Sequence, residues 1–499
     1  MSQIFFSAWD PSTPGGPLIS PLELWGTDGT AAGTHFIRNI FAAPYDPNTA
    51  DGGSDPDQFT AGALMFFTAN DGVHGRELWA SDGTTAGTVM LADIQPDQSS
   101  IFSGPTSLTA ANGRLYFAVD DSVHGYELWT SDGTPSGTVM VTDIDGTSNG
   151  SLGGAIGSLN GIAYFTARDG VHGYELWRSD GTAAGTFMIK DTLPGAADGT
   201  PFGFTVSNGA LFFAANDSAS GTELWKTDGS AAGTVKVKDI VPGSAQGSIL
   251  NYLTDVNGTL FFFGADTTHG AELWKSDGTD AGTVMVKDIN PNGAHSSPSN
   301  LTNVNGTLFF VADDGVHGRA LWKSDGSANG TVLVKDVNPD PNTAANTFFG
   351  NFAAFNGQLF FTAQDGTHGV ELWKSDGTGP GTVMIELVPG PNSAGLDQLK
   401  VIDGALYFTA ADPNSQPGWA LYRSDGSAAG THPIHNSPFA EFVAGLAATQ
   451  GNDTLTGTPY ADIIDGLGGD DTLVSLGGAD ILRGGDGDDT AVFPLGHGE

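Results

Sequence analysis

The chain has 499 residues, with 57 Asp and Glu against 18 Lys and Arg and no cysteine, so its formal net charge is −39. This charge argues against nucleic acid and anionic membranes as direct partners, because both are polyanions. The lack of cysteine excludes disulfide scaffolds, thiolate zinc sites and cysteine nucleophiles. No apolar run approaches the roughly 18 residues of a membrane span, and residues 1–10 lack the basic and apolar regions of a cleaved signal peptide.

A unit of about 50 residues recurs nine times, which is the length of a propeller blade. Each copy carries a central aromatic residue, an Asp-Gly pair three residues later and then a Gly-Thr pair. The aromatic residues are Trp25, Trp79, Trp129, Trp177, Trp225, Trp274, Trp322, Trp373 and Tyr422. Because each aromatic residue recurs with the blade period and follows a leucine on the same strand, we expect it in the core between blades rather than in a ligand platform.

Each unit is expected to form four short strands. In the copy at residues 299–337 they span 300–304, 307–312, 320–323 and 331–337. The first two strands are joined by Asn305-Gly306, a strong signal for a type I′ hairpin turn. Strands such as 260–263 are apolar at every position, which predicts a sheet packed on both faces. No segment shows helical periodicity.

These features predict an all-β fold with a large β-propeller of about nine four-stranded blades over residues 1–448. The first copy begins at its second strand, residues 4–8, and residues 439–445 can supply the missing strand and close the ring. Nine blades exceeds the usual four to eight, so an open superhelical stack or two unequal rings are the alternatives.

Two polar motifs repeat with the blades. Loops of the type Asp-Gly-Val-His-Gly contain His74, His124, His172, His269, His317 and His368, whereas the fifth copy has Ser220. We expect each histidine to bond local backbone, because one imidazole per blade is too far from the next to share an ion. The Glu before each Leu-Trp is expected to serve its own blade, and each Asp-Gly aspartate to cap its own turn.

Binding residues are more plausible where the repeat is interrupted. The interruptions are residues 11–21, the acidic insertion 42–58 with Asp46, Asp51, Asp55 and Asp57, and residues 412–419, which end at Trp419. Trp419 lies outside the repeated aromatic position, so it is the aromatic residue expected to contact a ligand. The loops between blades and the histidine loops should share one face of the ring, where binding residues usually lie.

Residues 449–499 form a second predicted domain with a nine-residue period. Asp453, Asp462, Asp471, Asp480 and Asp489 recur in register, each followed two residues later by an aliphatic residue. The last copy follows the pattern G-G-x-G-x-D-x-U-x except for Ala491. Two nonapeptides make one coil of a parallel β-roll, in which aspartates and glycine-loop carbonyls offer hard oxygen ligands suited to Ca²⁺. The predicted Ca²⁺ ligands are Asp453, Asp462, Gly466, Gly468, Asp471, Gly477, Asp480, Gly484, Asp486 and Asp489.

Both regions resemble known families. Residues 450–492 are similar to the repeats-in-toxin, or hemolysin-type, calcium-binding repeats of secreted proteins. Residues 23–431 resemble the bacterial ELWxxDGT repeat, as in Glu371-Leu372-Trp373-Lys374-Ser375-Asp376-Gly377-Thr378. The first resemblance implies an extracellular or cell-surface protein that is exported by the type I secretion machinery and folds on Ca²⁺. The second lends support to the fold and implies no chemistry.

Two functions follow as hypotheses. The first is a secreted, calcium-dependent binding or adhesion protein without catalysis, whose partner is extracellular polysaccharide or a cell surface. The second is an extracellular polysaccharide hydrolase or lyase with its site on the propeller face. No serine-centred elbow, His-Glu zinc motif or phosphate loop occurs in the sequence.

Overall fold

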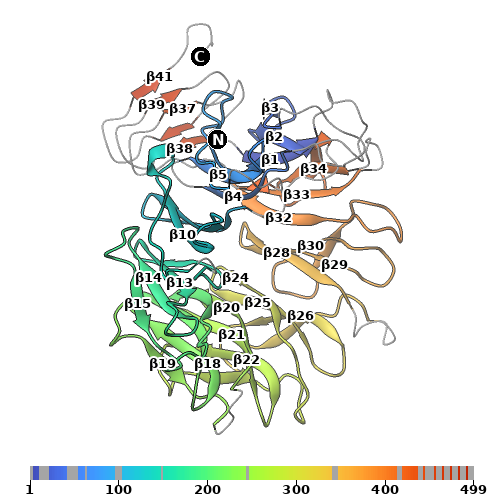
Figure 1. Ribbon diagram of the computed structural model, residues 1–499. Helices are drawn as coiled ribbons and strands as arrows, with labels where there is room; N and C mark the ends of the chain where they lie inside the picture. The colour runs from blue at the N-terminus through green and yellow to red at the C-terminus, as the bar shows by residue number, and fades with distance from the viewer. Residues whose placement is uncertain are drawn as a thin grey trace, which may run out of the picture.

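The computed structural model describes residues 4–9, 22–41, 54–61, 64–95, 104–147, 150–242, 247–339, 347–412, 419–436 and 442–443, and five short strands between residues 454 and 492. The described propeller residues form nine four-stranded antiparallel sheets arranged as blades around a ring (Figure 1). Their one helix is the short 3-10 helix η1 (Pro135–Gly137). None of the described helices is long and apolar enough to cross a membrane.

Blade 1 combines β36 with β1–β3, and blades 2 to 9 follow as consecutive groups of four strands. Each blade starts with an inner strand that lies beside the inner strand of a neighbouring blade. The inner strands are β36 (Phe442–Val443), β4 (Asp57–Ala61), β8 (Thr106–Ala111), β12 (Gly157–Leu159), β16 (Phe202–Ser207), β20 (Leu250–Val256), β24 (Ser299–Val304), β28 (Phe349–Phe355) and β32 (Asp397–Ile402).

The second strands are the most deeply buried part of each blade. They are β1 (Ile4–Trp9), β5 (Met65–Asn70), β9 (Arg114–Asp120), β13 (Ile162–Ala167), β17 (Ala210–Asp217), β21 (Thr259–Asp266), β25 (Thr307–Asp313), β29 (Gln358–Ala363) and β33 (Ala405–Ala411).

The third strands carry the Glu-Leu-Trp sequence. They are β2 (Leu22–Thr27), β6 (Arg76–Ser81), β10 (Tyr126–Ser131), β14 (Glu175–Ser179), β18 (Gly221–Thr227), β22 (Gly270–Ser276), β26 (Arg319–Ser324), β30 (Glu371–Ser375) and β34 (Trp419–Ser424). The outer strands are β3 (His35–Arg38), β7 (Val89–Met90), β11 (Val139–Met140), β15 (Phe187–Lys190), β19 (Val235–Lys238), β23 (Val284–Lys287), β27 (Val332–Lys335), β31 (Val383–Ile385) and β35 (His432–Asn436).

Blade 7 shows how closely the repeat predicts the strands. β24 to β27 coincide with the four predicted strands to within a residue or two at each end. Asn305 and Gly306 have φ of 50° and 85°, as a type I′ turn requires.

The hydrophobic core is divided into nine clusters, one between each pair of neighbouring blades. Phe309 and Phe310 are adjacent on β25, and they enter the clusters on opposite sides of blade 7. Likewise Leu273 is fully buried on one side of blade 6 and Trp274, 6% exposed, is buried on the other. Consecutive residues of a strand point to opposite faces, so both faces of each blade are packed. This confirms the predicted core position of the tryptophans.

The ring is closed by strands from the two ends of the propeller sequence. β36 pairs antiparallel with β1, which places Phe5 opposite Val443 and Phe6 opposite Phe442. Figure 1 shows β1 and β2 beside β33 and β34, and Trp25 of blade 1 shares a core cluster with Tyr407 of blade 9. The predicted closure is therefore confirmed, and a superhelical stack and two separate rings are both excluded.

Basic side chains tie neighbouring blades together near the Asp-Gly turns. Lys275, Lys323 and Lys374 each follow a repeat tryptophan, and each donates from Nζ to the turn-glycine carbonyl of the next blade at 2.8–2.9 Å. A chain with 18 Lys and Arg thus uses several of its few cations between blades.

Candidate functional site

The described part of the C-terminal region consists of two parallel ladders. β37 (Thr454–Thr456), β39 (Thr472–Val474) and β41 (Thr490–Val492) form one, and β38 (Ile463–Asp465) and β40 (Ile481–Arg483) form the other. Thr454 pairs with Thr472 and Thr472 with Thr490, a step of 18 residues. Two nonapeptides therefore make one coil, as predicted for a β-roll.

Nine of the ten predicted Ca²⁺ ligands occur in the sequence between these strands, and Asp453 directly precedes the first strand. All of them lie outside the described residues, so their individual assignment stays a prediction. The parallel strands nevertheless place equivalent residues of every second nonapeptide directly beside each other, for example Ile463 beside Ile481. Ca²⁺-binding coils need this backbone arrangement.

The Asp-Gly turns of the propeller are occupied by their own hydrogen bonds. In blade 6, Asp277 Oδ1 accepts from the Thr279 N–H at 2.8 Å and from its hydroxyl at 2.7 Å. The Ser276 hydroxyl pairs with that of Thr283 and accepts from the Gly278 N–H. A Cβ at Gly282 would overlap the Asp277 carboxylate, which explains the glycine of the Gly-Thr pair. The prediction that these aspartates cap their turns is confirmed.

The repeated glutamate is a buried brace. Glu272 is fully buried; its Oε2 accepts from the Ile289 N–H at 2.9 Å and from the Ser296 hydroxyl at 2.6 Å. It thereby fixes the loop that leads from one blade to the next. Burial is the largest cause that raises the pKa of Glu272 to about 7, and the same holds for Glu23, Glu77, Glu127 and Glu223. These carboxyls serve their own blades, as predicted.

The histidine loops differ from the prediction in one respect. Each imidazole Nδ1 contacts the carboxylate three residues earlier rather than backbone, for example His124 and Asp121 at 2.7 Å. That aspartate also accepts from the backbone N–H of the histidine. A local partner was expected for each imidazole. The sequence alone did not show that the aspartate carboxylate, rather than a nearby backbone carbonyl, would be that partner. The hydrogen bond to Asp121 is the main cause that raises the pKa of His124.

The loops between blades and the histidine loops lie on one face, as predicted. The Arg76 guanidinium, at the end of a histidine loop, donates to the Asp55 carbonyl before β4 at 2.9 Å. In blade 3 the Ser151 N–H bonds the Tyr126 carbonyl at 2.9 Å. In blade 4 the N–H of Gly173, directly after His172, bonds the Gly195 carbonyl of the loop that follows the blade at 3.2 Å. The two kinds of loop are therefore hydrogen-bonded to each other.

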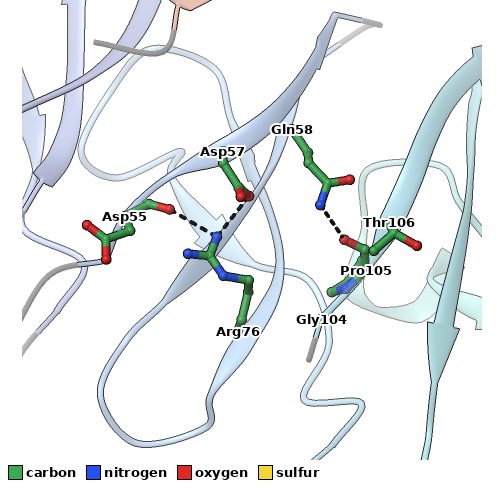
Figure 2. Close-up of a pocket in the computed structure, with 7 residues that line it drawn as sticks. All are labelled: Asp55, Asp57, Gln58, Arg76, Gly104, Pro105 and Thr106. Carbon is green, nitrogen blue, oxygen red and sulfur yellow. Dashed lines mark hydrogen bonds and ion pairs between the residues drawn. The ribbon is translucent and has the colours of Figure 1, made fainter. Parts of the chain in front are cut away.

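A polar cavity of about 330 Å³ opens on this face between blades 2 and 3. It is lined by part of the predicted acidic insertion, Asp55, Asp57 and Gln58, together with Arg76, Gly104, Pro105 and Thr106 (Figure 2). Arg76 Nη1 binds Asp57 Oδ1 at 2.8 Å, and Gln58 Nε2 donates to the Pro105 carbonyl at 3.1 Å.

Figure 2 shows the Asp55 carbonyl, not its carboxylate, directed toward Arg76. Asp57 is thus held by the guanidinium, while Asp55 faces elsewhere, so these two acids do not form a facing pair. Asp46 and Asp51 lie outside the described residues. Sequence reasoning missed Arg76 and Thr106, because only the fold brings the start of β6 next to the start of β8.

Trp419, at the start of β34, is half-buried, and its ring packs against Gly395. Part of the Trp419 side chain therefore packs within the protein, and part of it is exposed. Its contact with a ligand stays a prediction. Residues 11–21 and 413–418, the other predicted interruptions, lie outside the described residues.

Comparison with known families identifies the C-terminal repeats. Residues 448–482 and 465–491 match the RTX calcium-binding nonapeptide repeat. The chain is thus an all-β propeller followed by RTX repeats, and the ligand of these repeats is Ca²⁺, as predicted. No curated protein matches the chain in sequence.

Several solved structures are similar to this chain at low levels of identity. Puromycin hydrolase is 15% identical with a TM-score of 0.36, and the match covers 67% of this chain and 54% of that one. A structure from a study of two prolyl endopeptidases is 11% identical, with a TM-score of 0.41 and coverages of 68% and 50%. The chain thus spans about half the length of both.

The β-propeller domain of the Trilobed protease from Pyrococcus furiosus is 9% identical, with a TM-score of 0.34 and coverages of 68% and 99%. Likenesses at these values carry no information on what this chain binds or does.

Proposed function

We propose that this chain is a secreted, Ca²⁺-dependent binding protein exported by the type I secretion machinery. Its propeller would then act outside the cell as a non-catalytic module that binds neutral polysaccharide at a cell surface or in the extracellular matrix. The observation that carries the proposal is the RTX repeat in residues 448–491, with its two ladders in an 18-residue register.

The repeated polar residues favour binding over catalysis. The turn aspartates and loop histidines have partners within their own blades, and the buried glutamates bond the loop that leads to the next blade. Catalysis needs one asymmetric constellation, and in the cavity between blades 2 and 3 the Asp57 carboxylate is engaged by Arg76.

The inner strands supply groups suited to sugars. Phe202 on β16 and Tyr252 on β20 are 42% and 54% exposed, and these two strands are neighbours. Aromatic rings offer flat apolar surface with little loss of side-chain entropy, and the polar groups of the cavity at Gln58 and Thr106 offer hydrogen bonds. The net charge of −39 disfavours acidic polysaccharides.

Retention of the full chain on immobilised polysaccharides tests the binding function. We expect Ca²⁺-dependent retention on at least one neutral polysaccharide, without release of soluble products. Gln58→Asn should weaken retention if the cavity takes part. Gln398→Asn is the matched control, because both glutamines occupy inner-strand positions with positive φ (52° and 56°), a conformation that asparagine tolerates.

Release of soluble fragments would instead support the hydrolase or lyase. Failure of retention on every polysaccharide would overturn the binding proposal. Export is tested separately: in a host with a type I secretion system, the full chain should reach the medium and a chain that lacks residues 449–499 should not.

A further inference from the structure

One blade departs from the others in the loop that the repeated glutamate braces. Sixteen residues after the glutamate, blades 2 to 6 carry an aspartate: Asp93, Asp143, Asp191, Asp239 and Asp288. Two residues later, blade 3 has a second aspartate, Asp145. The other four blades have Gln95, Leu193, Val241 and Asn290 at that place.

This departure brings three carboxylates together. Glu127, Asp143 and Asp145 each offer one oxygen, and these three oxygens lie within 4.8 Å of one another. Glu127 is fully buried, and the side chain of Asp145 is only 4% exposed. Among the described residues, no other group of three or more such side chains lies this close.

A second observation points to a missing ligand. Glu127 Oε2 accepts from the Ser151 hydroxyl at 2.6 Å and from the Ile144 N–H at 3.4 Å. Oε1 of the same carboxylate is buried and has no hydrogen-bond partner among the described residues. One oxygen of the repeated glutamate also has no partner in blades 1, 2, 5 and 8, but among the described residues two further carboxylates lie beside it in blade 3 alone. Buried oxygens are almost always satisfied, so an orphan of this kind requires an explanation.

The positive charges nearby do not balance the three carboxylates. Arg168 Nε is 3.9 Å from Asp145 Oδ2, and the guanidinium also bonds the Gly150 carbonyl at 3.1 Å and lies over the Tyr174 ring. His124 contacts Asp121. A single bound proton would neutralise only one of the three acids, whereas a divalent cation neutralises two.

We propose that Glu127, Asp143 and Asp145 bind a divalent cation, Ca²⁺ by the chemistry of its donors, within blade 3 of the propeller. Ca²⁺ takes oxygen ligands at about 2.3–2.6 Å, so oxygens that share one ion lie up to about 5 Å apart. The three carboxylate oxygens meet this limit, because they all lie within 4.8 Å of one another. All three donors are hard carboxylate oxygens, the set that favours Ca²⁺ over softer metals.

The ion would join the third strand to the loop that leads to the next blade. Glu127 lies on β10, and residues 143–147 begin the connection to β12. Both blades also use neutral donors for this connection, but Glu127 has only two. In blade 4, Glu175 accepts from the Thr192 N–H, the Thr192 hydroxyl and the Gly199 N–H, so both of its oxygens are bonded. Calcium dependence would therefore extend into the propeller, beyond the C-terminal repeats.

Terbium luminescence excited through tryptophan favours this site over the repeats, because none of the ten tryptophans lies in residues 449–499. The variants below assign the emission to the site. Trp129 is two residues from Glu127 on the same strand, about 7 Å along it. In the full chain we expect sensitised Tb³⁺ emission that Ca²⁺ displaces. Asp145→Asn should weaken this binding at least about tenfold, since loss of a ligand exceeds the effect of losing a supporting group.

The asparagine variant keeps its local turn, because Asp145 Oδ1 accepts from the Thr147 N–H and hydroxyl and an amide oxygen can do the same. An unchanged melting temperature in chelator verifies folding. Asp191→Asn, at the equivalent of Asp143 in blade 4, is the matched control and should leave emission unchanged. Trp129→Phe should reduce emission without reducing the number of Ca²⁺ ions bound, counted by equilibrium dialysis.

Emission that is absent in the unmodified chain, or equal in the Asp145→Asn variant, would overturn the proposal. So would a cluster that responds to pH but not to Ca²⁺. In that case Ca²⁺ would change the melting temperatures of the unmodified chain and the Asp145→Asn variant by the same amount. A proton shared among the carboxylates would then explain the unpartnered oxygen of Glu127.

Discussion

The residues of the repeat are held by contacts that recur from blade to blade. The turn serine, aspartate and threonines bond one another, the glycine of the Gly-Thr pair leaves room for the aspartate, and the glutamate fixes the next loop. A motif with this many internal partners specifies a fold, so its recurrence by itself carries no information on a ligand.

The tryptophan tests this view most directly. Trp274→Ala should lower the free energy of unfolding by about 3–5 kcal/mol, because it empties a large part of the cluster between blades 5 and 6. Denaturant unfolding monitors the change, and any loss of polysaccharide retention should follow the fraction unfolded. Trp129, which is only partly buried, should have a smaller effect. Loss of binding at an unchanged midpoint would show that Trp274 acts on a ligand.

A single glycine tests the turn. Gly282→Ala should destabilise the chain by about 1–3 kcal/mol, because the added methyl group overlaps the Asp277 carboxylate that caps the turn. Gly154→Ala is the control, since a Cβ at Gly154 would contact nothing within 4 Å. Equal melting temperatures for the two variants would contradict the close packing of the turn.

At this scale the sequence predicts what depends on neighbours along the chain. The buried tryptophans and the capping aspartates follow from period and spacing. The carboxylate partner of each histidine could not be predicted, because the backbone carbonyls and the aspartate side chain of the same loop are both local acceptors. The cluster of Glu127, Asp143 and Asp145 depends on how the loop folds back onto β10. Its sequence signal, an extra aspartate in one copy, becomes visible when the copies are aligned on the repeated glutamate.

Among the strands, the inner ones differ most from expectation. Seven of them contain a register shift next to a residue with positive φ, such as Gln58, Tyr252 or Gln398. A β-bulge increases local twist and bends the strand. Because most of these residues are neither Gly nor Asn, their sequence gives no warning of the bulge.

The buried glutamates predict how stability depends on pH. Burial raises the pKa of Glu23, Glu77, Glu223 and Glu272 from 4.5 to about 7. The native state therefore binds more protons than the unfolded state between these values, and the free energy of unfolding falls as pH rises through this interval. A higher pH also ionises more carboxyl groups, which increases the repulsion between negative charges in a chain of net charge −39.

In chelator, the melting temperature should be higher near pH 5 than near pH 8. Glu223→Gln, which resembles the protonated side chain, should flatten part of this slope. A melting temperature that increases steadily from pH 5 to pH 8 would show that these carboxylates are ionised and stabilised in the folded protein.

The C-terminal ladders should depend on metal. Their strands are only three residues long, and without Ca²⁺ the repeated aspartates repel one another while single aliphatic residues bury too little surface to offset chain entropy. Adding millimolar Ca²⁺ to the full chain in chelator should increase the far-ultraviolet β signal. A chain that ends at residue 450 should show little of this increase, and an equal increase in both would locate the transition in the propeller.

For the whole molecule, the sequence predicts both the propeller and its closure. The evidence was the missing first strand of the first copy and the apolar segment near residue 440. The number of blades in one ring was not determined by the repeat, because the angle between blades depends on side chains that pack across nine separate clusters. The boundary at residues 448 and 449 and the resemblance of residues 23–431 to the ELWxxDGT repeat stay predictions.

Two truncations test the closure. Removal of residues 437–499 takes away β36 and exposes the edge of β1, whereas removal of residues 451–499 leaves β36 in place. We expect the first truncation to lower the melting temperature of the propeller far more than the second, as measured by calorimetry in chelator. Equal melting temperatures would show that the pairing of β36 with β1 contributes little.

The pairing of Phe5 with Val443 also has a consequence for the order of events during folding. The two partners are separated by almost the entire propeller sequence, so their contact has the largest loop-closure entropy in the ring. Blades 2 to 9 each consist of consecutive strands and can form as local units. The blade that contains the N-terminus has to wait for residues 442 and 443, so the first strand of the chain belongs to the last blade to be completed.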